Sequence, residues 1–328
     1  MKLSAFTIVD SHPIGSGEGR DRYREVLELA EGAEQGGLAA IWVAEHHFQP
    51  GGLCPSPPVL LSAIAARTRR VRVGALVSVL PFHNPIEVAE QYAMVDQLSG
   101  GRLNFGAGSG YIPVELDGFG VDPATKRERF DRALDTILAA WRGDAVRGDG
   151  STAAEVRLNV RPVQQPHPPI HIAVQRREAV PFVARRGANL ALVPYATVHD
   201  LDELAAEVQE FRQHLPEGSH GEVAAALHLY AGDRPERARA ALQRYLDSRL
   251  ATQSRFYQAK VDHDPHQASA ATIEAGGWAL FGRPGDVADR LEAFRRVGID
   301  EVLGIFDFGG LSAAEVSSSV RALGPLLR

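Results

Sequence analysis

The sequence predicts an α/β protein whose eight parallel strands close into a single (β/α)8 barrel, the TIM-barrel architecture. Short apolar runs rich in strand-forming residues alternate with longer amphipathic runs, which is the pattern of repeated strand–helix units. Eight strand candidates follow one another in near-regular alternation, which fits a closed barrel better than an open sheet. A chain of 328 residues is long enough for one such core. We therefore expect one domain over residues 1–328.

The first half of the chain predicts four strand–helix units. Two of the helices stop at the glycine pairs Gly36-Gly37 and Gly100-Gly101, which favour the left-handed backbone found after a helix. Asn84-Pro85 is an ordinary helix entry, with Asn84 as the N-cap. The predicted strands are Leu3–Val9, Leu38–Ala44, Val71–Leu80 and Leu103–Ala107, and the predicted helices are Asp21–Gln35, Pro57–Arg67, Pro85–Leu98 and Lys126–Trp141.

The second half of the chain continues the alternation and carries two predicted insertions. Alternation at Val156, Leu158 and Val160 predicts a small hairpin outside the barrel, within an insertion at about 143–169. The polar stretch at about 255–276 is interpreted either as a lid over the site or as a surface insertion. The remaining predicted strands are Ile170–Val174, Leu190–Val193, Ala224–Tyr230 and Glu301–Phe306, and the remaining helices are Ala179–Arg186, Pro235–Gln253 and Gly285–Val297.

Composition excludes several functional classes. With 45% hydrophobic and 23% charged residues, the chain has the balance of a soluble globular protein. A net charge of -6 gives no electrostatic reason to expect a nucleic-acid partner. No run of about 18 apolar residues predicts a membrane span, and the first apolar run ends at Asp10, too soon for a signal peptide. The single cysteine, Cys54, suits a reducing compartment, so we expect a cytoplasmic protein.

The chemistry of such a barrel lies in the loops after the strands, and Glu45-His46-His47 follows the second strand directly. Imidazoles at this position can transfer protons near neutral pH. The alternative is that one histidine faces solvent and the other bonds the backbone. A zinc site is less favoured, because no His-x-x-x-His motif or cysteine cluster supplies further ligands.

Two other loops carry candidate ligand-binding residues. Gly106, Gly108 and Gly110 at the end of the fourth strand permit close approach of a ligand, but their spacing is not that of a dinucleotide fingerprint. Arg176-Arg177 precedes a predicted helix start, where N–H groups and guanidinium groups together can bind a phosphate. Two solvated arginines are the alternative interpretation.

In their order and spacing, several segments resemble the bacterial luciferase-like flavin-dependent monooxygenases. The resemblance spans nearly the whole chain and rests on Ala44–Phe48, Val73–Pro81, Asp96–Arg102 with Phe105-Gly106, Phe119-Gly120, and Phe281–Val287 with Gly298–Glu301. It implies a luciferase-like TIM barrel that binds reduced FMN supplied by a separate flavin reductase. It also implies that O2 reacts with the reduced flavin to form a C4a-hydroperoxide, which oxygenates a small organic substrate that we expect to be hydrophobic or aromatic.

The resemblance assigns roles to individual residues. His46 matches the catalytic histidine, a proton relay or general base, and Glu45 would orient neighbouring groups. Leu76-Val77, next to Ala75, matches a non-proline cis peptide under the isoalloxazine ring. The implied phosphate turn follows Val174 and comprises Arg176, Arg177, Glu178 and Ala179.

Two departures from the family pattern concern that phosphate. Ser109 stands where luciferases carry an arginine, and Ala179 stands where the family carries a serine. Our hypothesis is that Arg176 or Arg177 supplies the missing charge, with a hydroxyl contact from Ser109 or Tyr111. Aromatic residues at Phe6, Phe48, Phe82 and Trp278 are candidates for an apolar substrate pocket, with ordinary core packing as the alternative.

Other functions stay open at this stage. Deazaflavin (F420)-dependent oxidoreductases share the barrel and often carry a Gly-x-Gly-x-Gly after the fourth strand, as at Gly106–Gly110, whereas Glu45–Phe48 favours FMN. A non-catalytic flavin-binding protein is a further possibility, and a barrel hydrolase or lyase lacks a nucleophile elbow here. The family resemblance also implies a homodimer, formed through the helices after strands one to three.

Overall fold

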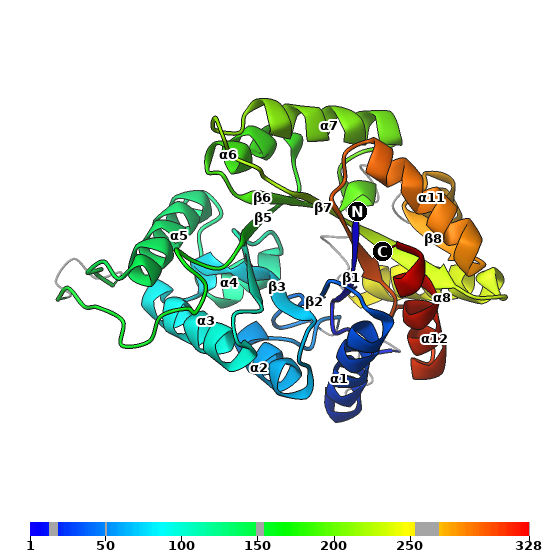
Figure 1. The fold of residues 1–328 in the computed structure, drawn as a ribbon, viewed down its shortest axis with the longest axis horizontal. Coiled ribbons are helices and arrows are strands. Elements are labelled where there is room, and N and C mark those ends of the chain that lie inside the picture. The colour runs from blue at the N-terminus through cyan, green and yellow to red at the C-terminus, as the bar shows by residue number, and fades with distance from the viewer. Residues whose placement is uncertain (13–18, 50, 149–153, 253–268, 328) are drawn as a thin grey trace.

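A closed ring of parallel strands forms the centre of the molecule (Figure 1). The structure is a computed structural model and describes residues 1–12, 19–49, 51–148, 154–252 and 269–327. The last strand of the ring pairs with both the first strand and the seventh, which closes the barrel. Its strands are β1 (Lys2–Thr7), β2 (Ala40–Val43), β3 (Arg72–Val79), β4 (Leu103–Gly108), β5 (Ile170–Val174), β6 (Asn189–Leu192), β7 (Val223–Ala231) and β9 (Glu301–Ile305). All eight predicted strands are confirmed to within two residues at either end.

A ninth strand, β8 (Ala279–Gly282), was not predicted from the sequence. It pairs with β7 alone, through residues 228–231. The carbonyl of Glu222 and the amide of His228 belong to the same edge of β7; the first bonds β6 and the second bonds the start of β8. The extra strand therefore extends the edge of β7 beyond β6 and is not part of the ring. Four residues give too short a pattern to distinguish from a loop.

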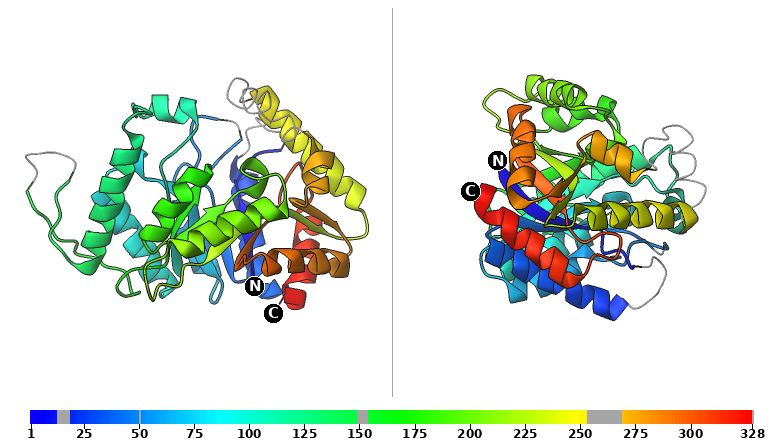
Figure 2. Two further views of the ribbon diagram at one scale, coloured as in Figure 1. Left: turned by 90° about the horizontal axis from the view of Figure 1, so that it is seen from above. Right: turned by 90° about the vertical axis from the view of Figure 1, so that its right-hand side faces the viewer.

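Helices surround the ring on the outside, as the two further views in Figure 2 show. They are α1 (Gly19–Gly36), α2 (Pro57–Arg67), α3 (Pro85–Ser99), α4 (Pro113–Gly118), α5 (Lys126–Arg142), α6 (Val180–Arg185), α7 (Leu201–Gln213), α8 (Pro235–Thr252), α10 (Ala270–Ala275), α11 (Pro284–Arg296) and α12 (Ala313–Leu323), with short 3-10 turns η1 (Leu80–Phe82), η2 (Arg177–Ala179), η3 (Pro194–Ala196) and η5 (Gly324–Leu327). No described helix combines the length and apolar character needed to cross a membrane. Sequence analysis placed no helix at α4, α7 or α12.

Local sequence explains where individual helices begin and end. The side chain of Asn84 accepts a bond from the N–H of Ile86 at the start of α3, as predicted, and Gly100 ends that helix with a φ of 68°. Ser312 and Glu315 form a reciprocal capping box at the start of α12. These caps satisfy backbone groups that a helix end otherwise leaves unpaired.

The barrel interior contains a small cluster of hydrogen-bonded polar groups. The buried Glu301 carboxylate accepts hydrogen bonds from Ser4 (2.5 Å) and from the Trp42 indole (3.0 Å). Burial raises the pKa of Glu301 despite these bonds. The Trp42 ring in turn lies directly against Gly74, where an added Cβ would come within 2.4 Å of the ring. Glycine at position 74 is therefore a packing requirement.

Two glycines of β4 make room for β3 where its register shifts between Ala75 and Ser78. A Cβ on Gly106 would lie 2.1 Å from the carbonyl oxygen of Ala75, and a Cβ on Gly108 would lie 2.4 Å from Val77 Cγ2. Strand packing thus accounts for glycine at both positions, which the sequence analysis had interpreted as room for a ligand.

The two predicted insertions are described only in part. In the described part of 143–169, Val146 and Val156 form an antiparallel bridge, which is shorter than the hairpin expected there. Leu158 and Val160 instead pack singly against the core, so their alternation reflects burial without strand pairing. In the second insertion, residues 255–268 lie outside the described residues, and 270–275 form α10, which Ser269 caps.

We expect Gly74→Ala to destabilise the fold, because the new methyl group collides with the Trp42 ring in a closely packed interior. Overpacking of this kind costs about 1–3 kcal/mol of unfolding free energy. Urea unfolding measures the change. Gly285→Ala in α11 is the matched control, since its Cβ would meet nothing within 4 Å. Equal midpoints for the two variants would contradict the packing role of Gly74.

Candidate active site

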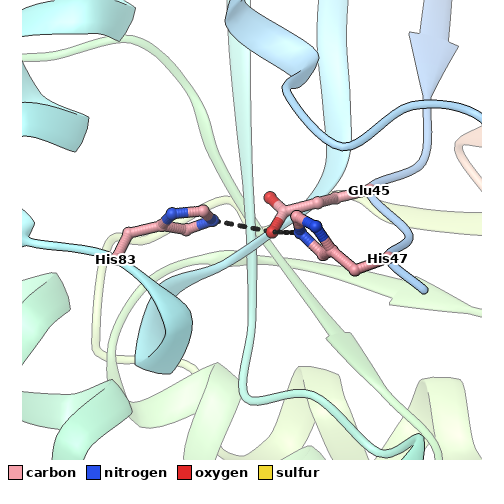
Figure 3. Close-up of side chains that lie close together, drawn as sticks. All are labelled: Glu45, His47 and His83. Carbon is pink, nitrogen blue, oxygen red and sulfur yellow. Dashed lines mark hydrogen bonds and ion pairs between the residues drawn. The ribbon is translucent and has the colours of Figure 1, made fainter. Parts of the chain in front are cut away.

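The residues after β2 form the first half of the site. Glu45 is buried, and its Oε1 lies 3.0 Å from His47 Nε2 and 2.7 Å from His83 Nε2 (Figure 3). Its other oxygen, Oε2, accepts the N–H of Val79 at 3.1 Å. Burial alone would raise the pKa of Glu45, but the bonds from the two imidazoles and Val79 hold it below the usual value. An ionised carboxylate therefore ties the end of β2 to the end of β3.

The same three side chains bring donor atoms together as a metal site would, within 4.8 Å of one another. The two nitrogen-to-oxygen distances in this group are those of ordinary N–H···O hydrogen bonds. Each imidazole can donate its Nε2–H to the Glu45 carboxylate. Hydrogen bonds therefore account for this arrangement without a bound metal ion. The predicted orienting role of Glu45 is thus directed at His47 and His83. His83 was missed by the sequence analysis because it belongs to a different loop.

His46 has a different partner, which sequence reasoning did not find. Its Nδ1 lies 3.0 Å from Oε1 of Glu115, a buried residue of the short helix α4. The same oxygen accepts the N–H of His47 (2.9 Å) and the side-chain amide of Gln49 (2.5 Å). The 3.0 Å contact favours donation of the His46 Nδ1–H to Glu115 over the longer 3.4 Å contact of the same nitrogen with Gln49 Nε2. The Nε2 of His46 is then the basic nitrogen.

Packing also restricts the His46 ring. Gly52 presses on it so closely that an added Cβ would lie 2.3 Å from His46 Cβ. The side chain of His46 is 11% exposed, and no described residue donates to or accepts from its Nε2. An oriented imidazole with one available nitrogen can accept or deliver a proton at the barrel mouth.

The end of β3 lies next to this histidine, since Val43 of β2 pairs with Ala75 of β3. The Leu76–Val77 peptide bond is cis, as the family resemblance implied. Ala75 and Leu76 are buried and Val77 is half-buried. The β2 end, which His46 follows, and the β3 end, which carries the cis peptide, are therefore neighbours in the sheet.

The predicted phosphate turn differs from expectation in two ways. Arg177 pairs with Glu210 at 2.8 Å, and its side chain is 52% exposed. The N–H of Ala179, expected to face a phosphate, donates to the carbonyl of Arg176 at 3.0 Å. This bond belongs to the 3-10 turn η2. The helix α6 therefore begins at Val180, one residue later than predicted, and has only six residues. These two groups thus have partners within the protein, and their predicted phosphate contact stays a prediction.

A second cation, Lys126, lies beside Arg176 and was not predicted. Lys126 is the first residue of α5, and its Nζ donates to the carbonyl of Gly110 at 2.6 Å. Partial burial lowers the pKa of Lys126, and the neighbouring positive charge of Arg176 lowers it further. Two cations that repel each other, with the half-buried Ser109 next to Gly110, match the donor set of a phosphate group. Lys126 is distant in sequence from both loops, so no local motif identified it.

A further group of side chains consists of three tyrosines around one arginine. Arg249 of α8 bonds Tyr245 and lies 5.2 Å from its ring centre, and its charge also acts on Tyr111 and Tyr195. Burial raises the pKa of all three tyrosines. His228 of β7 completes the group: burial lowers its pKa to about 3, and neither ring nitrogen has a hydrogen-bond partner in the part of the chain that the structure describes. Tyr111 also hydrogen-bonds Gln175 and interacts electrostatically with Glu115.

The four aromatic residues proposed for a substrate pocket do not gather in one place. Phe82 stacks on Phe119 at 4.7 Å, and Phe48 joins them while remaining 61% exposed. Trp278 is buried next to β8 and packs against Phe294, and Phe6 is buried in β1. Side chains of similar chemistry therefore serve separate parts of the core and surface.

Comparison with sequences of known proteins agrees with this geometry. The family model of luciferase-like monooxygenases matches residues 1–301. The oxygenase component of the flavin-dependent trigonelline monooxygenase from Acinetobacter baylyi is 27% identical over 85% of this chain and 82% of its own length. The 4-hydroxyprotoasukamycin monooxygenase of Streptomyces nodosus subsp. asukaensis is 34% identical over 60% of this chain. A Sinorhizobium fredii protein, y4wF, is 42% identical over 54% of it. The chain spans about half the length of these last two relatives, 55% and 52%.

Solved structures share the fold. The oxygenating constituent of 3,6-diketocamphane monooxygenase from Pseudomonas putida, solved with FMN, superposes with a TM-score of 0.82 over 99% of this chain and 97% of that one, at 16% identity. An F420-dependent secondary alcohol dehydrogenase superposes with a TM-score of 0.76 over 100% and 99%, also at 16% identity. Identities this low compare the architecture alone. Together, the matched family model and the barrel show that the chain belongs to the luciferase-like monooxygenase family.

Proposed function

We propose that the chain is the oxygenase component of a two-component, FMNH2-dependent monooxygenase acting on a small organic substrate. The observation that carries this proposal is the His46–Glu115 pair, an oriented imidazole with its Nε2 available, which follows the strand next to the one with the cis peptide Leu76–Val77. The relative named as an oxygenase component supports the need for a separate flavin reductase.

The residues present fit a flavin phosphate. Arg176, Lys126 and the hydroxyl of Ser109 would hold it, and the β3 end with Ala75–Val77 would face the ring system. When bound, reduced FMN supplies the two electrons with which O2 is split between the substrate and water. Glu115 holds His46 in the Nδ1–H tautomer, so that Nε2 moves a proton to or from the reacting groups.

To test this activity, the protein is mixed with photochemically reduced FMN, 18O2 and, in turn, each of a panel of apolar and aromatic compounds. We expect one 18O atom in the product by mass spectrometry. We also expect His46→Asn to lower turnover by roughly 10²–10⁴-fold, the usual contribution of a positioned acid or base. Transfer of a hydride between F420 and alcohols, with no 18O incorporation, would instead support an F420-dependent oxidoreductase. Flavin binding without turnover of any compound would leave a non-catalytic flavin-binding protein.

Glu115→Ala tests the role of Glu115 separately from any substrate. Because the carboxylate selects the Nδ1–H tautomer of His46, we expect the ring nitrogen shifts in ¹⁵N NMR to move toward a tautomer mixture. Turnover should fall by about tenfold or more, as is usual for an orienting partner. Glu45→Ala removes the neighbouring carboxylate, which bonds the side chains of His47 and His83 and not that of His46, and is the control, with the tautomer retained. An unchanged His46 spectrum in Glu115→Ala would rule out the orienting role.

The cations of the proposed phosphate site differ in a way that binding can measure. Loss of a charge-assisted hydrogen bond costs about 1.5–3 kcal/mol, roughly ten- to a hundredfold in Kd. We expect this loss for reduced FMN in Arg176→Ala and in Lys126→Ala, under anaerobic titration. Arg177→Ala should bind normally, because Arg177 pairs with Glu210. Riboflavin lacks the phosphate and should be insensitive to all three substitutions. Weaker riboflavin binding would contradict a phosphate role.

We also propose that the protein is a homodimer joined through α2 and α3. Exposed apolar side chains gather on these neighbouring helices, namely Val59 at 71%, Leu98 at 62% and Met94 at 53% exposure. Light scattering should report a dimer, and Met94→Glu with Leu98→Glu should yield monomers. Leu326→Glu, exposed near the C-terminus, is the control and should stay dimeric. A monomeric unsubstituted protein would refute the proposal.

A further inference from the structure

A second cavity lies away from the proposed flavin site, in the groove between α1 and α12. It measures about 620 Å³, a size typical of small-molecule sites. Its inner end is formed by residues that follow β1 and β9, and its length runs along the facing sides of the two helices, which lie side by side in Figure 1. It shares no residue with the His46–Glu115 pair or with the proposed phosphate site.

Carboxylates dominate the polar lining of this groove. Asp10, Asp21, Glu25, Glu28 and Asp307 line it, against one guanidinium, Arg22, and the imidazole of His12. Arg22 contacts Asp307 directly and lies 2.9 Å from Glu25 and 3.9 Å from Asp10, so its charge is already shared among three acids. Asp21 and Glu28 lie 3.2 and 3.9 Å from Arg24, and Asp10 lies 2.9 Å from His12. The five carboxylates still outnumber these basic groups, and an excess of negative charge attracts cations.

One of these carboxylates has an unsatisfied oxygen. The side chain of Asp307 is only 6% exposed. Its Oδ2 accepts bonds from Thr7 and Arg22, but its Oδ1 has no hydrogen-bond partner among the described residues. Burial raises the pKa of Asp307 and the nearby charge of Asp10 raises it further, against the opposing effect of Arg22. A buried, unpaired acceptor costs free energy that a ligand donor can recover.

Apolar side chains also line the groove. Leu29, Val316 and Val320 line the stretch between the helices. Gly32 of α1 leaves the groove open, since a Cβ there would meet only Ser317 Oγ, at 3.8 Å. Among the described residues, the side chains of the groove form no three-ligand metal cluster. Charge at one end and apolar surface along the length suit an organic ion better than a metal.

We propose that the groove between α1 and α12 binds an amphiphilic organic cation, with its ammonium group at Asp307 and Asp10 and its apolar body between Leu29 and Val316. A primary ammonium donates three N–H bonds, which matches the unpaired Oδ1 of Asp307. The buried Arg22 Nε also lacks a partner, so a carboxylate ligand is the rival that the test must distinguish. This site is independent of the proposed monooxygenase activity.

Hexylamine, hexanol and hexanoate have the same type of apolar chain and differ in charge. Calorimetric titration of the full-length protein with each compound therefore separates the contribution of the charge to binding from that of the apolar chain. We expect saturable binding of hexylamine at neutral pH, with affinity at least tenfold above hexanol and no binding of hexanoate. Asp307→Asn should weaken hexylamine by at least tenfold, and added salt should weaken it further. Equal binding of hexanol, tighter binding of hexanoate, or no binding of hexylamine would overturn the proposal.

Gly32→Leu provides a test that leaves every carboxylate in place. The new side chain fills the groove, so hexylamine binding should be lost while reduced FMN binding is unchanged. Gln35→Leu adds the same side chain at an exposed position of α1 outside the groove and should bind hexylamine normally. Retained binding in Gly32→Leu would place the amine elsewhere and refute the site. Circular dichroism confirms that each variant is folded.

Discussion

The pairing of β9 with both β1 and β7 closes the barrel, and every functional feature depends on that closure. In a closed ring of parallel strands all the carboxyl ends meet at one rim. Loops separated by more than a hundred residues are therefore brought together there, among them the β2 end with His46 and the β5 end with Arg176. The closed ring also removes exposed sheet edges from all its strands, and only the short β8 adds a further one.

Buried carboxylates then convert this general rim into a specific site. Glu45 and Glu115 both lose solvation, and each recovers it through several hydrogen bonds from neighbouring groups. Glu45 ties two strand ends together, whereas Glu115 selects the tautomer of His46. The neighbouring His46 and His47 thus have separate functions, because each bonds a different carboxylate.

Close packing and chemistry compete for the same positions in this barrel. Gly74, Gly106 and Gly108 are required by neighbouring side chains and backbone, so they provide less evidence for a ligand than their sequence context suggested. The groove between α1 and α12 shows the opposite case. There a Cβ added at Gly32 would make only an ordinary contact with Ser317 Oγ, at 3.8 Å, and the acidic lining lies near the ends of β1 and β9.

The sequence by itself determined the eight ring strands, the cap of α3 and the barrel class, because local periodicity, turn chemistry and motif order encode them. Its resemblance to the family also implied the cis peptide at Leu76–Val77, and it proposed His46 and Arg176 as site residues. Only the tertiary structure decided that Glu115 bonds His46, that His83 joins Glu45, and that Lys126 lies beside Arg176. These partners come from loops and helices far apart in the chain, and no local pattern records which side chains meet when the ring closes. The same reason explains why the sequence did not predict the partners of Arg177 and of the N–H of Ala179, which depend on α7 and on the turn formed before α6.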